Sequence, residues 1–202
     1  MIAIVDYGVG NLFSLRSSFA KIGADTVVTA DKNVIESADK IILPGVGAFA
    51  DAIKKLQDTG LGEVVKAQAK LGKPIMGICL GMQLLFERSF EYGEHKGLGL
   101  IKGDVIPMKG YINDSLKVPH IGWNGLYFPK KHFLFSHLKE GDCAYFVHSF
   151  FATNCGESVI ATTEYGKMLT AAVASGNVMG CQFHPEKSGD VGLAILRAFC
   201  QA

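Results

Sequence analysis

The feature that most constrains the fold is a cysteine set between two glycines, in the stretch KPIMGICLGMQLLFE. The apolar run Pro74 to Ile78 is short and begins with a proline, which is typical of a buried strand. From Leu80 to Glu87 the apolar and polar residues follow helical spacing, so we expect a helix there. Cys79 is therefore expected at the bend between a strand and a helix.

The G-x-C-x-G pattern is typical of a nucleophile elbow. A sharp strand-to-helix turn needs residues without a Cβ on either side, here Gly77 and Gly81, and it points the side chain between them out above the sheet. The helix N-terminus that follows favours thiolate over thiol at Cys79. An inert core cysteine is the alternative, because free cysteine is among the most buried residue types. A catalytic interpretation therefore requires a base.

The first half of the chain alternates strands with helices. Strands that are apolar at successive positions, such as Ile41-Ile42-Leu43, favour a parallel sheet covered on both faces. In such a sheet, reactive groups gather at the carboxyl ends of the strands. The expected strands cover residues 2–6, 26–29, 41–43 and 74–78, and the expected helices cover residues 12–22, 48–56 and 61–71.

The second half changes character, because most of its expected elements are strands. These cover residues 102–108, 125–128, 143–150, 158–164, 169–175 and 177–183, and a helix over 191–201 follows. Ser175-Gly176-Asn177 is a candidate hairpin turn. We therefore expect an α/β fold with a mixed central sheet flanked by helices and an additional antiparallel portion. No linker divides the chain, so residues 1–202 are expected to form a single domain.

Composition excludes several classes of partner. The chain has 20 Lys and Arg against 19 Asp and Glu and no long basic run, so neither nucleic acid nor a membrane is expected as a partner. The N-terminus lacks the features of a signal peptide. Five scattered cysteines without a C-x-x-C pair argue against a disulfide framework or a zinc site. We expect a cytoplasmic protein without a metal or cofactor.

Among the six histidines, His184 stands out because it leaves the last expected strand in His184-Pro185-Glu186. Pro185 favours an extended conformation at His184, and residues two apart in an extended segment point the same way. The imidazole and the carboxylate are therefore expected to face one site, as a thiol nucleophile requires. The alternative is a strand-end histidine beside an exposed glutamate, and the presence of Cys79 argues against it. His148 is expected to be structural or near the substrate.

The elbow and the His-Pro-Glu tripeptide together resemble the triad glutamine amidotransferases, whose Cys-His-Glu site hydrolyses glutamine to glutamate and ammonia. Further segments narrow the resemblance to the glutaminase subunits of imidazole glycerol phosphate synthase, from histidine biosynthesis. These segments are Asp6–Asn11, Pro44–Gly47, Pro119–Asn124, Tyr145–Ser149 and His184–Ser188. The resemblance covers nearly the whole chain and implies a flavodoxin-like class I glutamine amidotransferase fold.

The resemblance also implies a role for each residue of the triad. Cys79 attacks the side-chain amide carbon of glutamine and forms a thioester. His184 takes the thiol proton and passes one to the departing ammonia, and Glu186 orients His184. The oxyanion needs preorganised donors, for which the Leu80 N–H and the segment Gly45-Val46-Gly47 are the candidates. The two glycines of that segment permit a peptide flip.

The same resemblance implies a substrate clamp and a partner. Residues expected to hold or contact the α-amino acid end of glutamine are Gln83, Glu91, Ser149 and Phe150, the last often a tyrosine in the family. The implied partner is a (β/α)8 barrel synthase subunit that makes imidazole glycerol phosphate and aminoimidazole carboxamide ribonucleotide. Residues expected at or near that interface are Asn11, Trp123, Tyr145 and Lys187, with the Pro44–Gly47 segment. Trp123 suits a binding hot spot if it is exposed, and a half-buried core aromatic is the alternative.

Two other functions remain open from the sequence. A paralogue that feeds ammonia to a different synthase, such as one amidating a surface sugar, would share every catalytic residue. A redox-sensing module could use the same sheet and elbow cysteine. His184, Glu186 and Gln83 argue against the sensor, because a sensor thiol needs neither a triad nor a glutamine clamp.

Overall fold

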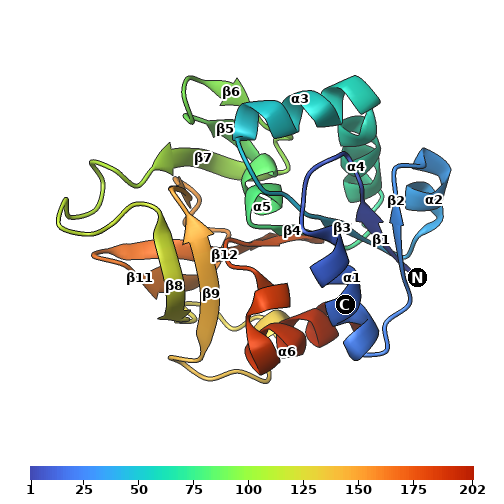
Figure 1. Cartoon of the computed structure of the whole chain (residues 1–202). Helices are drawn as coiled ribbons and strands as arrows, with labels where there is room; N and C mark the ends of the chain where they lie inside the picture. The colour runs from blue at the N-terminus through green and yellow to red at the C-terminus, as the bar shows by residue number, and fades with distance from the viewer.

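The computed structural model describes residues 1–202 and is built around a seven-stranded sheet (Figure 1). Across the sheet, the strands are β11 (Val159–Glu164), β12 (Met168–Ser175), β13 (Val178–Cys181), β4 (Ile75–Ile78), β3 (Lys40–Leu43), β1 (Ile2–Val5) and β2 (Thr26–Thr29). The strands from β13 to β2 pair in parallel, whereas β11 and β12 are antiparallel to their neighbours. The predicted mixed sheet is confirmed, and so is the hairpin turn, since Ser175 pairs with Val178.

Helices cover both faces of this sheet (Figure 1). One face carries α2 (Lys32–Ser37), α3 (Phe49–Thr59), α4 (Leu61–Lys70) and α5 (Leu80–Leu84), and the other carries α1 (Leu12–Lys21) and α6 (Gly189–Cys200). Strand β3 shows how the sequence specifies this arrangement. Ile41 and Leu43 lie in one apolar core, and Ile42 lies in the other. The prediction of a parallel sheet buried on both faces is therefore confirmed.

Two smaller sheets supply the additional portion, which is mostly antiparallel. The four-stranded sheet has the order β10 (Phe150–Thr153), β7 (Ile101–Pro107), β5 (Phe86–Ser89) and β6 (His95–Lys96), and only β5 and β7 pair in parallel. The two-stranded sheet pairs β8 (His120–Gly125) with β9 (Cys143–His148). Two 3-10 turns complete the chain, η1 (Phe133–Phe135) and η2 (Pro185–Lys187). The expected strand over 143–150 is thus divided at Ser149 between two sheets.

Two predicted elements are wrong. Helix α5 ends at Leu84 instead of continuing to Glu87, because the carbonyls of residues 84–86 accept hydrogen bonds from the N–H groups of residues 98–100. This long-range pairing replaces the next helical turn and leads into β5. The strand expected over 125–128 is absent, since β8 ends at Gly125 and Tyr127 forms only an isolated bridge with Thr162. The elements α2, β5, β6 and β8 are absent from the sequence-based prediction, as is β10 beyond Phe150.

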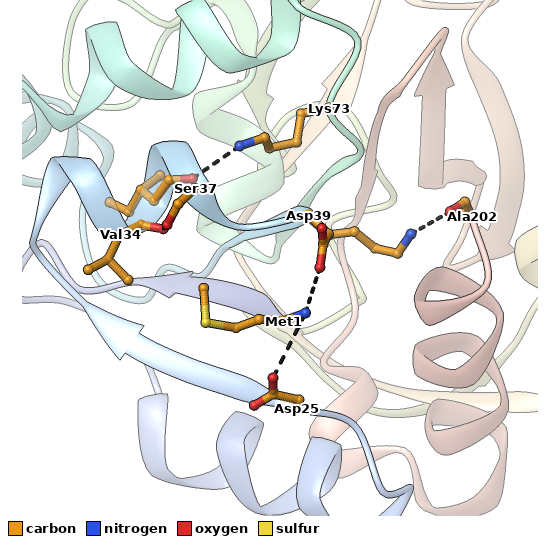
Figure 2. Close-up of polar contacts among 9 residues, drawn as sticks. Met1, Asp25, Val34, Ser37, Asp39, Lys73 and Ala202 are labelled. Atoms are coloured by element: carbon orange, nitrogen blue, oxygen red, sulfur yellow. Dashed lines mark hydrogen bonds and ion pairs between the residues drawn. The ribbon is translucent and has the colours of Figure 1, made fainter.

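Polar side chains gather at the amino ends of the parallel strands, next to the residues that begin β1 to β4 (Figure 2). The Met1 ammonium lies 2.6 Å from Asp39 Oδ2 and 3.9 Å from Asp25 Oδ2. Lys73 Nζ donates to the Glu36 carbonyl at 2.7 Å, near the end of α2. No helix in the structure combines the length and the apolar character that crossing a bilayer requires.

Candidate active site

Cys79 occupies the bend between β4 and α5, at the carboxyl end of the central strand. Its backbone has φ 53° and ψ −112°, a region that L residues rarely adopt. The bend is held on both sides, because the Cys79 N–H donates to the Cys181 carbonyl at 2.8 Å and the Cys79 carbonyl accepts from the Gln83 N–H at 3.2 Å. The neighbouring strand and the first turn of α5 therefore fix the strained residue in place.

The two flanking glycines are required for close packing. A Cβ on Gly77 would lie 2.7 Å from Met82 Cα, and a Cβ on Gly81 would lie 1.8 Å from the Leu43 carbonyl oxygen. Helix α5 thus approaches the ends of β3 and β4 more closely than any side chain would permit. This contact with the neighbouring strand is the physical reason for the G-x-C-x-G spacing.

His184 and Glu186 meet as expected, but through a different backbone geometry. His184 is extended, with φ −100° and ψ 96°, whereas Pro185–Lys187 forms the 3-10 turn η2. The turn, rather than an extended tripeptide, brings Glu186 Oε1 to 2.8 Å from His184 Nδ1. Both side chains are almost fully buried, at 3% and 1% exposed. Ser188 supports this segment, because its hydroxyl donates to the His184 carbonyl and accepts from the Tyr145 N–H.

The charge state of His184 follows from its neighbours. Burial acts to lower the pKa of His184, but its contacts with Cys79 and Glu186 outweigh burial and raise that pKa to about 9. The imidazolium therefore lies between the Glu186 carboxylate and the Cys79 sulfur. The second oxygen of the Glu186 carboxylate, Oε2, is buried and has no hydrogen-bond partner.

A cavity of about 440 Å³ opens in front of Cys79. The predicted site residues that line it are Val46, Gly47, Cys79, Leu80, Gln83, Glu91, Ser149, Phe150, His184 and Lys187. Gly45 and Glu186 do not line it. Tyr92, Pro119 and Val147, which were not among the predicted site residues, also line the cavity, as does His148, which was expected to be structural or near the substrate.

Gln83 and Glu91 are both anchored by protein groups. Gln83 Nε2 donates to the Phe150 carbonyl at 3.1 Å and to Gln182 Oε1 at 2.9 Å. Glu91 Oε2 accepts from the Phe49 N–H at 2.8 Å, at the first residue of α3, and burial raises the pKa of Glu91. Both side chains thus reach the cavity in defined orientations.

The segment Pro44–Gly47 forms another part of the wall. The buried Tyr7 hydroxyl donates to the Pro44 carbonyl at 2.6 Å, which anchors the beginning of the segment. Gly47 has φ +95°, a value that suits glycine and strains other residues. The backbone N–H groups of Val46 and Gly47 donate to no backbone carbonyl. These N–H groups therefore remain the candidate oxyanion donors that the sequence predicts.

His148 belongs to a buried network behind the cavity. Its Nδ1 donates to the Phe150 carbonyl at 2.8 Å, and its Nε2 lies 3.0 Å from His120 Nδ1. Burial lowers the pKa of His148 to about 4, so its imidazole is neutral near pH 7. The Phe150 carbonyl already accepts from both Gln83 and His148, and the Ser149 carbonyl accepts from the Met108 N–H. Backbone groups near Ser149 and Phe150 were expected to assist the substrate. Their two carbonyls accept hydrogen bonds within the protein, whereas the Ser149 N–H donates to no backbone carbonyl.

The predicted interface residues lie in different settings. Trp123 and Tyr145 face each other across β8 and β9, with ring centroids 6.0 Å apart. Trp123 is 56% exposed, so the alternative of a half-buried core aromatic is wrong. Lys187 Nζ lies 5.8 Å from the centre of the Tyr145 ring, whereas Asn11 precedes the first turn of α1. Trp123, Tyr145 and Lys187 therefore form one group, and Lys187 connects it to the cavity.

Gln182 is the main residue that the sequence-based prediction missed. It is fully buried, and its Nε2 lies 3.7 Å from Cys79 Sγ. The only signal in the sequence was a polar residue in the otherwise apolar run from Val178 to Phe183. Such a signal marks a buried polar group that needs a partner, but it does not identify the partner.

Comparison with known proteins places this geometry in a family. The family model for class-I glutamine amidotransferase matches residues 3–201. The imidazole glycerol phosphate synthase subunit HisH of Sulfurimonas denitrificans is 54% identical, over 98% of this chain and 97% of its own length. That of Lactococcus lactis subsp. lactis is 47% identical, over 99% and 98%.

Solved structures agree at the level of the fold. A crystal structure of a glutamine amidotransferase has a TM-score of 0.76 at 20% identity, covering 99% of this chain and 100% of that one. The structure of PurLQS from Thermotoga maritima has a TM-score of 0.73 at 22% identity, covering 99% and 97%. The predicted fold class is confirmed. With these similarities and a cysteine, a histidine and a glutamate at one cavity, the chain belongs to the class-I glutamine amidotransferases and, within them, to the HisH subunits of imidazole glycerol phosphate synthase.

Proposed function

We propose that this chain hydrolyses glutamine to glutamate and ammonia, and that it supplies the ammonia to a synthase subunit in histidine biosynthesis. The observation that carries this proposal is the strained Cys79 at a cavity shared with His184, which in turn contacts Glu186. A surface or core cysteine has no need of such an arrangement. Relatives named as imidazole glycerol phosphate synthase subunits support the pathway.

The chemistry proposed for the site is acyl transfer through a thioester. The Cys79 sulfur attacks the amide carbon of glutamine, and His184 donates a proton to the ammonia that leaves. Water then attacks the thioester, with His184 taking its proton, and releases glutamate. Throughout, the negative Glu186 stabilises the charged form of His184 and holds its Nδ1.

We assign the oxyanion to backbone donors on two segments. The Leu80 N–H lies in the first turn of α5, where N–H groups have no partner within the helix. Val46 and Gly47 supply further free N–H groups on the opposite segment. We assign the α-amino acid end of glutamine to Gln83, Glu91 and the Ser149 N–H, since the carbonyls at 149 and 150 are already engaged.

We infer that the synthase partner is a (β/α)8 barrel subunit that docks over the cavity mouth as a heterodimer. Ammonia is mostly protonated at neutral pH and is then useless as a nucleophile, so it must pass to the partner without entering bulk solvent. The exposed Trp123, with Tyr145 and Lys187 beside it, supplies an aromatic and cationic docking surface next to the cavity. The five free cysteines fit a reducing compartment, which we take to be the cytoplasm.

The proposal is tested by separating the two half-reactions. The chain is purified with its barrel partner, and synthesis of imidazole glycerol phosphate is measured with glutamine or with ammonium salt as the nitrogen source. Cys79→Ala should abolish the glutamine-dependent rate and leave the ammonium-dependent rate, because the barrel chemistry does not use the thiol. Retained glutamine turnover in Cys79→Ala would contradict the assignment. A wild-type pair that hydrolyses glutamine but makes no product would favour a paralogue serving another synthase.

A further inference from the structure

Gln182 lies between the nucleophile and the proposed substrate clamp. It follows β13 directly, and its N–H donates to the Ala171 carbonyl of β12 at 2.8 Å. Its side chain is fully buried and does not line the cavity. One end of the carboxamide contacts Gln83, and the other end lies 3.7 Å from Cys79 Sγ. The buried Gln182 amide therefore connects Cys79 with Gln83, which are both proposed to act on the same substrate molecule.

The hydrogen bonds of Gln83 determine which end of the Gln182 amide faces the sulfur. Gln83 Nε2 has two hydrogens, one directed to the Phe150 carbonyl and the other to the Gln182 side chain. A carbonyl only accepts, so the atom of Gln182 that faces Gln83 must be its oxygen. The Gln182 NH₂ group is then directed toward Cys79. The sulfur thus receives a donor from a side chain that cannot turn without losing a buried hydrogen bond.

We propose that Gln182 is a further catalytic residue, which stabilises the Cys79 thiolate and fixes its position relative to Gln83. A hydrogen bond to an ionised acceptor is about twice as strong as one between neutral groups, so the contact favours thiolate over thiol. A neutral amide achieves this without placing a second buried cation beside His184. This inference rests on the proposed glutaminase function.

The same contact assists the second half-reaction. When water attacks the thioester, its oxygen bonds to the acyl carbon and its proton passes to His184. The C–S bond then breaks, and its electron pair remains on the Cys79 sulfur. A donor already aimed at that sulfur stabilises the leaving group at the moment its charge develops. The geometry therefore serves both formation and breakdown of the intermediate.

The test measures alkylation of Cys79 by iodoacetamide as a function of pH, followed by mass spectrometry of the Cys79 peptide. Gln182→Met replaces the amide by an unbranched side chain of similar size that donates no hydrogen bond. We expect the pH midpoint of alkylation to rise by about one unit, the size expected from losing one hydrogen bond to a charged group. Gln68→Leu, at another buried glutamine that lies in α4 and does not line the cavity, is the matched control and should leave the midpoint unchanged.

Glutamine turnover supplies a second readout. In Gln182→Met, kcat should fall about tenfold at pH 7 and recover toward the wild-type value near pH 9, where the thiolate forms without help. A purely structural role would lower kcat at every pH. Gln83→Met should give a smaller midpoint shift, and the double variant should match Gln182→Met alone, because both act through one hydrogen-bond chain.

The outcomes separate the two proposals. An unchanged midpoint in folded Gln182→Met overturns the role of Gln182 while leaving the glutaminase function intact. Wild-type Cys79 that alkylates no faster than the exposed Cys143 at pH 7 would instead contradict the proposed function itself. If Gln182→Met does not fold, Gln182→Leu takes its place, since it likewise has no hydrogen-bond donor for the sulfur. An unchanged midpoint in that variant would be equally decisive against the inference.

Discussion

The two ends of the parallel strands are built on opposite principles. At the carboxyl ends, Cys79 has a strained backbone, His184 and Glu186 form a buried pair, and Gly81 presses against the neighbouring strand. At the amino ends, Met1 contacts Asp39 and Asp25 (Figure 2), and both carboxylate side chains are exposed. In one sheet, the carboxyl ends of the strands are therefore held by buried, closely packed contacts, whereas the amino ends are held by exposed ion pairs.

The difference shows that the contacts most sensitive to substitution lie at the carboxyl ends of the strands. Exposed ion pairs add little to the free energy of unfolding, because water screens the charges and the two side chains must be ordered. Buried pairs and strained residues persist only when the surroundings hold them in place. We therefore expect substitutions at the carboxyl ends to be severe and substitutions at the amino ends to be mild.

Gly81→Ala should have the largest effect. Its Cβ would lie 1.8 Å from the Leu43 carbonyl oxygen, a backbone atom that cannot move aside easily. The loss in the free energy of unfolding should exceed the ~1–3 kcal/mol of ordinary overpacking. Urea denaturation and glutamine turnover measure it. Gly156→Ala is the control, because its Cβ would meet no atom within 4 Å. Equal stability of the two variants would remove the close approach as an explanation of the elbow.

His184→Asn should lower glutamine turnover by on the order of 10⁴–10⁶ while the fold survives. Glu186→Gln should lower it less, because that residue acts by orienting and charging the imidazole. Steady-state kinetics with the complete complex decides between them. Near-normal turnover in His184→Asn would transfer the role of base to His148, the other histidine on the cavity wall.

Gly47→Val and Gly72→Val compare the two ends directly. Both glycines have positive φ, +95° and +85°, so each variant adds backbone strain, and a Cβ added at either would meet no atom within 4 Å. Only Gly47 lines the cavity, whereas Gly72 lies just before β4 at the amino end. Turnover should fall about 10²–10³-fold in Gly47→Val alone, as when one oxyanion donor is lost. Similar losses in both variants would mean that strain, not position, matters.

The stability of the protein should fall in acid because of His148. Burial lowers its pKa from 6.5 to about 4, so the unfolded chain binds a proton at a higher pH than the folded chain does. The stability that depends on neutral His148 is complete above pH 6.5 and is lost as the pH falls toward 4, by up to about 3 kcal/mol. In His148→Gln, the slope of unfolding free energy against pH should be shallower in this window. An unchanged slope would assign the acid sensitivity to other groups such as His120.

Asp39→Asn should have the smallest effect. The Met1 ammonium loses its closer carboxylate, and Asp25 remains 3.9 Å away. We expect no change in glutamine turnover and only a slight change in the thermal denaturation midpoint, which high salt should abolish. A loss of turnover in Asp39→Asn would show that the amino end is coupled to the site and would break the comparison.

The same contrast explains which features could be predicted from sequence. The parallel strands follow from runs such as Ile41-Ile42-Leu43, because burial on both faces leaves a local signal. Cys79 could be recognised as the candidate nucleophile because the elbow needs only five residues, from Gly77 to Gly81, and all of them are adjacent in the sequence. Strand β5 was missed because it pairs with β7, which lies outside the local sequence window. Its own residues continue the helical pattern of the segment before it.

Individual residues of the site could be predicted from the sequence, but the hydrogen bonds that connect them could not. His184 and Glu186 were paired correctly, although a 3-10 turn rather than an extended segment brings them together. Gln182 has no motif, since a buried amide is recognisable only by the partners that folding supplies. Likewise, nothing in the sequence indicates that the Phe150 carbonyl accepts from both Gln83 and His148.

The backbone of Cys79 has a consequence that concerns handedness. Reversing the signs of φ 53° and ψ −112° gives a conformation close to the extended region that L residues prefer, so a D residue would adopt the observed backbone with little strain. A D-cysteine introduced by chemical synthesis would relax this peptide, but its thiol would project from the opposite side of the Cα atom. The strain at this position is thus inseparable from the direction of the sulfur. A D residue would therefore lower the backbone strain of the turn but remove the proposed nucleophile from the cavity.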